Sequence, residues 1–476
     1  MTKLKIVMIG GGSYQWTPVI GRDLMSHEHL RGSTFVLYDI DPKPLPSMRK
    51  LMRKIATAMG TDFKVLATTD PREAFTSADF AILSITTGGY DMMEHDLAIP
   101  AKYGIFQTVG DTVGPGGLVR ALRNIPAIIE IGRIMEQYCP NAWMLNLSNP
   151  MTVITRTFLR ETSIKTVGLC HELFGTMELL LEIFGLEDQS NLAPESQMGI
   201  ERMLDASGRH LWQREMNVEV GGINHCIWMT GLTVRGKNGF EMLKQFLKNP
   251  ERFAKKMPPP PGKTARQPGD LALMMQNHRL KLELFPIYGC LPAAGDRHVA
   301  EFFPYLLHSE KYAAERFGLT PYTIEWQRDS RAMYKNWCDW WNAGKIPLPM
   351  DRSEEMASDI IVALSGGRPI QAIVNRPNLH QIANLPKHAV VESMALVDSS
   401  GIHPFAIGEL PPAVQSLLAR HVANQEMIVD AALAGDRQAA LQVLLNDPLT
   451  RDFDDAKKML DEMLDATRQY LPQFGQ

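Results

Sequence analysis

Two short stretches of the chain carry side chains that could bind a metal or move a proton. Cys170 and His171 stand side by side in TVGLCHELFG, and His225 lies in GGINHCIWM. A thiolate and an imidazole both bind divalent transition metals, and an imidazole also exchanges protons near neutral pH. Taken alone, a Cys or His in an apolar stretch is more often an ordinary core side chain. The two stretches therefore leave open either a buried thiol with a polar neighbour or half of a metal site.

A glycine-rich turn near the start of the chain predicts a dinucleotide site. LKIVMIGGGS is typical of an apolar strand that runs into glycines, WTPVIGRDLMSH of a helix, and STFVLYDIDP of a second strand. Glycines let the backbone approach a pyrophosphate, the helix N-terminus offers free N–H groups, and an acidic residue after the second strand can bind ribose hydroxyls. The expected contacts are Gly10, Gly11, Gly12, Ser13 and Asp39. Gln15 stands where the fingerprint has its third glycine, so a glycine turn in an unrelated α/β protein remains the alternative.

Strands and helices continue to alternate through the first half of the chain. Apolar runs at 78–85, 142–150 and 164–169 predict strands, and the pattern at 121–139 predicts a helix. This alternation is typical of a Rossmann-like, doubly wound parallel sheet with helices on both faces. Ligands gather at the carboxyl ends of such strands. The residues that follow predicted strand ends, and that we expect on this functional edge, are Thr86, Asn149, Cys170 and His171.

The second half of the chain has a less regular pattern. We expect two domains, a Rossmann-like domain over residues 1–195 and an α+β substrate domain over residues 196–476. Residues 217–236 predict paired strands that enclose GGINH, and the Pro-rich residues 255–270 predict a surface loop. The stretch AAGDRHVAEFF concentrates four ionisable side chains within six residues.

Composition excludes several classes of protein. The chain has 476 residues, 45% of them hydrophobic and 21% charged, with a formal net charge of −4, which gives no reason to expect a nucleic-acid partner. No apolar run is long enough to span a membrane, and glycines interrupt the N-terminal apolar stretch where a secretion signal would continue. The five cysteines show no paired spacing, which favours reduced thiols and a cytoplasmic location.

Several stretches together resemble glycoside hydrolase family 4, the NAD- and Mn²⁺-dependent glycosidases. They are IGGGSYQWTPVI, YDID, GDTVGPGGLVRALRNIPAIIEI, AWMLNLSNPMTVIT, VGLCHE, GINH, VDSSGIHPF and AALAGDRQAALQVLLNDPLT, in family order over nearly the whole chain. The resemblance implies that NAD⁺ oxidises the sugar at C3, a base removes the C2 proton, the C1 group leaves, water adds, and the hydride returns. It also implies that Cys170 and His225 hold a divalent cation, Mn²⁺, which polarises the sugar oxygens.

For the proton-transfer groups the resemblance offers alternatives. Asp296 is the first candidate for the base and Tyr288 the second, while a surface ion pair between Asp296 and Arg297 is the competing interpretation. His171 stands where one branch of the family has its acid, and an imidazole can protonate a leaving group near neutral pH.

The resemblance also bears on the substrate. It implies that Asp111 and Asn149 contact the sugar, although Asn149 could instead shape the turn before the following proline. Met93 stands near the place where phospho-sugar branches carry an arginine, which argues against a 6-phosphate group. The Cys-His-Glu triplet resembles the α-galacturonidase branch, and Arg297 and Arg279 are candidates to bind a uronate carboxylate. The implied substrate is an unphosphorylated α-glycoside or α-uronide, with α-galacturonide as the narrower hypothesis.

Two other functions share the expected fold. A dehydrogenase of the lactate/malate type would use the same NAD site without a thiolate metal site, and an NAD-sensing scaffold would bind the nucleotide without turnover. We expect a small-molecule substrate, no nucleic-acid or membrane partner, and, as in the family, a homodimer or homotetramer.

Overall fold

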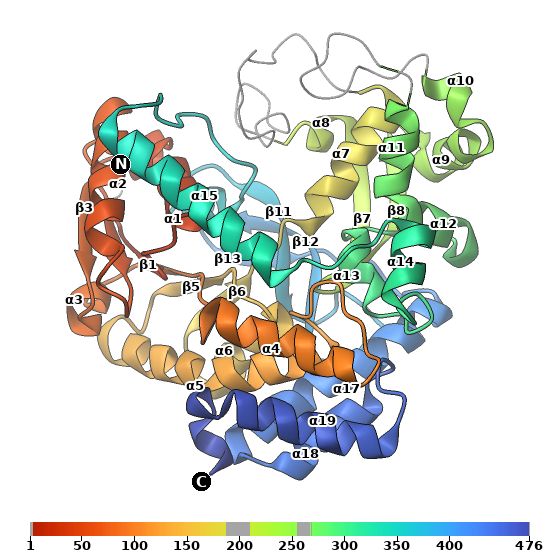
Figure 1. The fold of residues 1–476 in the computed structure, drawn as a ribbon. Helices are drawn as coiled ribbons and strands as arrows, with labels where there is room; N and C mark the ends of the chain where they lie inside the picture. Colours follow the sequence, from red (N-terminus) through yellow and green to blue (C-terminus); the bar gives the residue numbers. More distant parts are fainter. Residues whose placement is uncertain (1–2, 187–209, 255–266, 268, 476) are drawn as a thin grey trace.

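The first half of the chain builds the predicted parallel sheet. In the computed structural model, which describes residues 3–186, 210–254, 267 and 269–475, the strands lie side by side in the order β3-β2-β1-β4-β5-β6, all parallel. Figure 1 labels β3, β1, β5 and β6 of this sheet. They are β1 (Lys5–Ile9), β2 (Thr34–Tyr38), β3 (Lys64–Thr68), β4 (Phe80–Leu83), β5 (Trp143–Asn146) and β6 (Lys165–Gly168). This is the strand order of dinucleotide-binding folds, whose ligand crevice opens where the order reverses, at β1 and β4. The Rossmann-like prediction is confirmed.

Helices connect these strands, as expected for right-handed crossovers. They are α1 (Trp16–Met25), α2 (Leu45–Ala58), α3 (Pro71–Phe75), α4 (Gly89–Lys102), α5 (Gly114–Tyr138) and α6 (Met151–Glu161). All four residues of β4, and all but the first of β1 and β2, are buried. Because both faces of the sheet are covered, these strands form near-continuous apolar runs in the sequence rather than alternating ones.

The second half of the chain extends the same sheet with antiparallel strands. The order continues from β6 through β11, β12, β7 and β8 to β10, and Asn375 of β11 pairs with Gly168 of β6. These strands are β7 (Met216–Ile223), β8 (Cys226–Val234), β10 (Leu291–Pro292), β11 (Ile370–Pro377) and β12 (Val390–Asp398), with β9 (Lys237–Asn238) and β13 (Gly401–Pro404) beside them. The predicted strand pair at 217–236 is confirmed as β7 and β8, whereas β11 had no counterpart among the expected elements.

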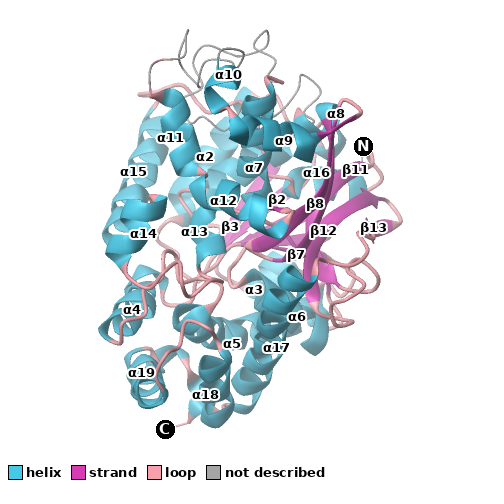
Figure 2. Cartoon of the chain, turned by 90° about the vertical axis from the view of Figure 1, so that its right-hand side faces the viewer, coloured by secondary structure: helices cyan, strands magenta, loops and turns pink. Residues whose placement is uncertain are grey.

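Late helices pack against the first half of the chain. Among the described residues, α15 contacts α2 and α4, α17 contacts α5 and α6, and α19 contacts α4 (Figure 1). In the view turned by 90°, α17 and α6 lie together beside the long strands β7 and β12 (Figure 2). The remaining α-helices of the described residues are α7 (Glu172–Phe184), α8 (Trp212–Glu215), α9 (Gly239–Lys248), α10 (Pro250–Ala254), α11 (Asp270–Asn277), α12 (Arg279–Tyr288), α13 (Asp296–Ala300), α14 (Glu310–Phe317), α15 (Ile324–Ala343), α16 (Ala357–Leu364), α17 (Pro412–Ala434), α18 (Arg437–Asn446) and α19 (Phe453–Ala466).

The predicted division of the chain into two domains stays a prediction. Its boundary near residue 195 and most of the predicted loop at 255–270 lie outside the described residues. One hydrophobic cluster runs through both halves, from Phe35 of β2 to Trp228 of β8. No helix in the described parts of the chain is long and apolar enough to cross a membrane.

The glycine turn after β1 is closely packed against neighbouring strands. Gly10 has a φ of +87°, and a Cβ there would lie 2.1 Å from the carbonyl oxygen of Ser84. A Cβ on Gly11 would lie 2.7 Å from the Cα of Leu37 in β2. Since the obstructing atoms are backbone, neither position can accept a side chain without moving a strand.

This packing predicts the effect of adding a methyl group. We expect Gly11→Ala to lower the free energy of unfolding by about 1–3 kcal/mol, because β2 must shift to make room. Gly175→Ala is the matched control: a Cβ there meets nothing within 4 Å, and alanine in the interior of α7 should stabilise by up to about 1 kcal/mol. Urea denaturation of the two variants measures both effects, and equal midpoints would contradict the close packing at Gly11.

Candidate active site

Polar residues follow the carboxyl ends of neighbouring parallel strands. Ser13 lies beyond β1, Asp39 beyond β2, Thr86 beyond β4, Asn149 beyond β5 and Cys170 beyond β6. Parallel strands end on the same edge of a sheet, so these residues approach one another although they are far apart in sequence.

The glycine turn and the acidic residue after β2 form one hydrogen-bonded unit. The backbone N–H of Gly12 donates to Oδ2 of Asp39 at 2.8 Å, and the N–H groups of Gly10 and Gly11 donate to the carbonyl of Tyr38 at 3.0 and 2.9 Å. Gln15, at the start of α1, makes no side-chain cap. Ser13 Oγ accepts the N–H of Trp16, the first residue of α1, at 3.1 Å. A glycine turn that leads into a helix N-terminus, with a carboxylate fixed beside it, fits the phosphates and ribose of a dinucleotide.

Asp111, His225 and His298 form a compact cluster at this edge. Each offers a ligand atom within 4.8 Å of those of the other two, and the two imidazole rings lie 3.7 Å apart between centroids. Asp111 precedes α5, His225 lies at the turn between β7 and β8, and His298 lies in α13. Asp111 and His225 were expected at the site from the sequence. His298 was not, although the ionisable stretch AAGDRHVAEFF that contains it points to this region.

Hydrogen bonds orient the members of the cluster. Thr112 Oγ1 donates to Oδ1 of Asp111 at 2.7 Å and lies 2.6 Å from Nδ1 of His225. Because the one hydroxyl proton of Thr112 goes to Asp111, Nδ1 of His225 carries the proton that Thr112 accepts. Asn149 Nδ2 donates to Oδ2 of Asp111 at 2.9 Å. The free lone pair of His225 is therefore on Nε2.

Charge within the cluster matches the needs of a cation. Burial lowers the pKa of His225 to about 3, with His298 contributing, so the imidazole is neutral. Burial acts to raise the pKa of Asp111, but His298, Arg120 and the hydrogen bond from Thr112 outweigh it and lower this pKa to about 2. Nδ1 of His298 is buried and has no hydrogen-bond partner in the described residues. A carboxylate, a neutral imidazole and an unsatisfied ring nitrogen fit a divalent transition metal such as Mn²⁺.

Cys170 lies next to the turn that carries His225. Burial, Glu392 and Glu172 raise the pKa of the thiol well above its ordinary value, while the side chain of Asn224 and the backbone N–H of Glu172 act in the opposite direction. Asn224 immediately precedes His225, so the structure brings the stretch that contains Cys170 and the stretch that contains His225 to the same place.

Two glutamates, Glu392 fully buried and Glu172 partly buried, support this region, and the sequence predicted a role for neither. Oε2 of Glu172 accepts the N–H of Gly295 at 2.7 Å, and its Oε1 lies 3.6 Å from Nε2 of His298. Oε2 of Glu392, in β12, accepts from Asn224 at 2.9 Å and from Asn375 at 3.1 Å. Burial raises the pKa of Glu392 to about 7. Glu392 thus ties the His225 turn to β11, a link that no local pattern could predict.

His171 pairs with a residue from the second half of the chain. Its Nδ1 lies 3.1 Å from Oε1 of Glu355, and 45% of its side chain is exposed. Partial desolvation of this half-exposed ring acts to lower its pKa, but Glu355 outweighs the effect and raises the pKa to about 10. The imidazole therefore carries a proton at neutral pH.

The structure gives Asp296, Tyr288 and Arg297 neighbours outside the cluster. Asp296 accepts the backbone N–H groups that open α12, at 2.7 and 3.3 Å, and burial raises its pKa to about 6. The ring of Tyr288 packs 4.9 Å from that of Trp228. The guanidinium of Arg297 lies 4.5 Å over the ring of Tyr322. Their catalytic and sugar-binding roles remain predictions.

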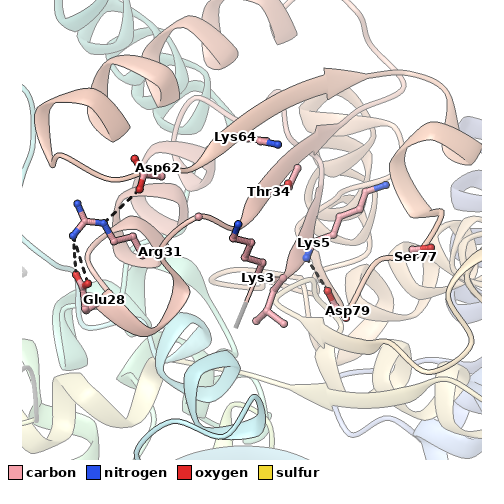
Figure 3. Close-up of a pocket in the computed structure, with 11 residues that line it drawn as sticks. Lys3, Lys5, Glu28, Arg31, Thr34, Asp62, Lys64, Ser77 and Asp79 are labelled. Atoms are coloured by element: carbon pink, nitrogen blue, oxygen red, sulfur yellow. Dashed lines mark hydrogen bonds and ion pairs between the residues drawn. The ribbon is translucent and has the colours of Figure 1, made fainter. Parts of the chain in front are cut away.

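A large cavity lies at the opposite edge of the sheet. It has a volume of about 710 Å³ and lies at the amino ends of the parallel strands, where Lys5 and Thr34 open β1 and β2 (Figure 3). Arg31 of this cavity pairs with Glu28 at 3.3 Å, and Asp79 accepts the N–H of Lys5 at 2.8 Å. The described residues that line this cavity include no His or Cys, so it lacks the donor set of the cluster at the carboxyl edge.

The strand order and the cluster at the carboxyl edge define an α/β enzyme built on a nucleotide-binding sheet. The chain belongs to family 4 of the glycosyl hydrolases: residues 5–186 match the model of the family 4 glycosyl hydrolases, and residues 220–450 match that of their C-terminal domain.

Curated relatives are similar in sequence to this chain over almost its full length. The chain is 34% identical to an alpha-galacturonidase of Bacillus subtilis, over 98% of each protein. It is 36% identical to an alpha-galacturonidase of Thermoanaerobacterium saccharolyticum, over 98% of this chain and 96% of the relative.

Two solved structures share the fold. The Bacillus subtilis protein lplD is 32% identical, with a TM-score of 0.82 over 98% of this chain and 100% of that one. A 6-phospho-alpha-glucosidase from gut microorganisms, solved with NAD and Mn²⁺, is 21% identical, with a TM-score of 0.77 over 99% and 100%.

The cluster predicts a loss of metal affinity when one imidazole is removed. We expect His298→Phe, which keeps a ring against His225, to weaken Mn²⁺ binding at least about 10-fold, because a ring nitrogen is lost. The control is His308→Phe, since His308 is exposed and stacks 4.2 Å from Tyr312 outside the cluster. Electron paramagnetic resonance of free Mn²⁺ during titration gives both affinities. Unchanged binding by His298→Phe would remove this residue from the site.

Proposed function

We propose that this chain hydrolyses an unphosphorylated α-uronide, best an α-galacturonide, with NAD⁺ and a divalent cation, Mn²⁺, as cofactors. One observation carries the proposal: Asp111, His225 and His298 converge at the carboxyl edge of a nucleotide-binding sheet, beside Asn149 and Cys170. Four relatives between 33% and 36% identical are named alpha-galacturonidases, whereas an alpha-galactosidase matches at 29% and a probable 6-phospho-beta-glucosidase at 27%.

The NAD⁺ site that we propose lies on the turn after β1. Its residues are Gly10, Gly11, Gly12, Ser13, Asp39 and Thr86. The fixed carboxylate of Asp39 suits the ribose hydroxyls, and the N-terminus of α1 suits the pyrophosphate. The 6-phospho-alpha-glucosidase that shares this fold was solved with NAD and Mn²⁺, which supports both cofactors.

We assign the cation to Cys170 and His225, with Asp111 and His298 as further candidates. Sulfur, nitrogen and oxygen donors would leave positions for sugar oxygens, as a catalytic metal requires. When bound, NAD⁺ and the cation would supply a hydride acceptor for C3 and an electrophile for the sugar oxygens. Asn149, which already donates to Asp111, would orient the sugar hydroxyls.

His171 is our candidate for the group that protonates the leaving oxygen. Glu355 takes Nδ1 of the ring, which leaves the Nε2–H for the substrate. The raised pKa, about 10, keeps this proton in place at neutral pH.

The base at C2 remains a choice between two candidates. Asp296 has a pKa near 6, where a carboxylate can accept a proton, although both of its oxygens accept backbone N–H groups. Tyr288 packs beside Trp228. Substrate binding would have to free Asp296 from α12, or Tyr288 takes its place.

All five cysteines are unpaired, which supports a reducing, cytoplasmic location.

The proposal predicts turnover that needs both cofactors and consumes neither. With p-nitrophenyl α-galacturonide, NAD⁺, Mn²⁺ and a reductant, we expect release of nitrophenol without accumulation of NADH, because the hydride returns to the sugar. Loss of turnover on chelation and recovery with Mn²⁺ would follow. Steady growth of NADH absorbance without nitrophenol release would instead indicate a dehydrogenase.

We expect metal-dependent turnover to require the thiol of Cys170. We expect Cys170→Ser to lower kcat/KM at least about 100-fold, since the hydroxyl is a poorer ligand, while NAD⁺ binding measured by calorimetry is retained. Cys139→Ser is the control, because Cys139 is buried next to Lys5 and Asp79 at the opposite edge of the sheet. Full activity of Cys170→Ser would count against the assignment.

A further inference from the structure

Among the buried basic side chains of the described residues, Arg120 lacks the carboxylate partner that the other three have. Arg22, Arg120, Arg123 and Lys281 are the Lys and Arg residues that are buried in the described part of the chain, each at most 7% exposed. Arg22 lies 3.6 Å from Asp23, Arg123 lies 2.7 Å from Asp96, and Lys281 lies 4.0 Å from Asp296. Within the described residues, Arg120 has no carboxylate oxygen within 4.0 Å. A buried charge without a counter-ion is unfavourable, so an anion from outside the chain would complete this environment.

Arg120 lies between the proposed cofactor site and the proposed metal site. It belongs to the second turn of α5, and its Nη2 donates to Oγ1 of Thr86 at 3.2 Å. Its Nε is buried and has no hydrogen-bond partner among the described residues. Its charge acts on Asp111, the carboxylate of the cluster.

The acidic residues near Arg120 already have other partners. Both oxygens of Asp96 accept from Arg123, each at 2.7 Å, which is a complete two-point contact. The oxygens of Asp111 accept from Thr112 and Asn149. The guanidinium therefore keeps unused donors, with a charge that no neighbouring carboxylate contacts directly.

We propose that Arg120 binds the carboxylate at C5 of the sugar and thereby selects a uronide over the neutral sugar. This inference rests on the proposed function, because it assumes a sugar at the Asp111–His225–His298 cluster. A guanidinium presents its N–H groups in a planar fork that matches a carboxylate, and a buried site strengthens this contact. A CH₂OH group in the same place would leave the charge unpaired.

Other cations near the cluster are less suited to this role. Lys281 donates to Thr176 at 2.8 Å and faces Asp296, and Arg297 stacks on Tyr322. The turn that opens α4, residues 84–90, contains no Lys or Arg, so Arg120 is the buried cation that adjoins it through Thr86. A phosphate of NAD⁺ is the rival anion, and we expect it instead at the glycine turn after β1.

Direct binding tests this inference without relying on turnover. D-Galacturonate and D-galactose differ only in a carboxylate and a CH₂OH group, and calorimetry with the NAD⁺- and Mn²⁺-loaded protein gives their affinities. We expect the wild type to prefer galacturonate. Arg120→Gln should weaken galacturonate at least about 30-fold, leave galactose within about twofold, and leave the affinity for NAD⁺ unchanged.

Two further variants keep the test decisive. Arg123→Gln removes an equally buried guanidinium that has its own carboxylate, so it should lower the melting temperature and preserve the galacturonate preference. Arg120→Lys keeps the charge without the fork, so it should fold and retain part of the preference, and it replaces Arg120→Gln if that variant does not fold.

The outcomes separate the two proposals. Equal weakening of both sugars, or weakening of NAD⁺ by Arg120→Gln, would overturn the carboxylate role, the latter in favour of a cofactor phosphate. A wild type without preference for the acid would also overturn it. If the wild type prefers galacturonate through Arg120 but hydrolyses no α-galacturonide, this inference stands and the proposed hydrolysis fails.

Discussion

The structure depends on how a buried carboxylate, Asp111, is stabilised. A carboxylate removed from water is costly unless hydrogen bonds and positive charge compensate for it. Here Thr112 and Asn149 donate to its two oxygens, the positive charge of Arg120 acts on it, and two imidazoles from other parts of the chain lie 3.8 and 3.9 Å away. The arrangement holds only while the ends of β5, the β7–β8 turn and α13 stay in register.

The continuous sheet supplies that register. Pairing of β11 with β6, through Asn375 and Gly168, joins the antiparallel half of the sheet to the Rossmann-like half. Glu392 extends this link, because it accepts from Asn375 on one side and from Asn224, next to the cluster, on the other. Chemistry on this edge therefore depends on strands more than 200 residues apart in the sequence, at 165–168 and 370–377.

Local pattern predicted those parts of the site that lie directly after a strand. Apolar runs that end in glycine or in a polar residue identified the positions of Gly10, Asp39, Asn149 and Cys170, since strand direction alone places them on one edge. The structural role of the Asp296 carboxylate, by contrast, could not be predicted from local pattern. In sequence it belongs to an ionisable cluster, but in the structure it accepts the first N–H groups of α12, a helix whose own start lacks a side-chain cap.

The sequence by itself determined the family, the nucleotide-binding half of the sheet and the residue types at its functional edge, because these depend on short-range order along the chain. Only the tertiary structure decided that His298 joins His225 and Asp111, that Glu355 pairs with His171, and that Arg120 is buried without a carboxylate. Those contacts connect segments brought together by packing, and electrostatic compensation between distant side chains leaves no periodic trace in a sequence.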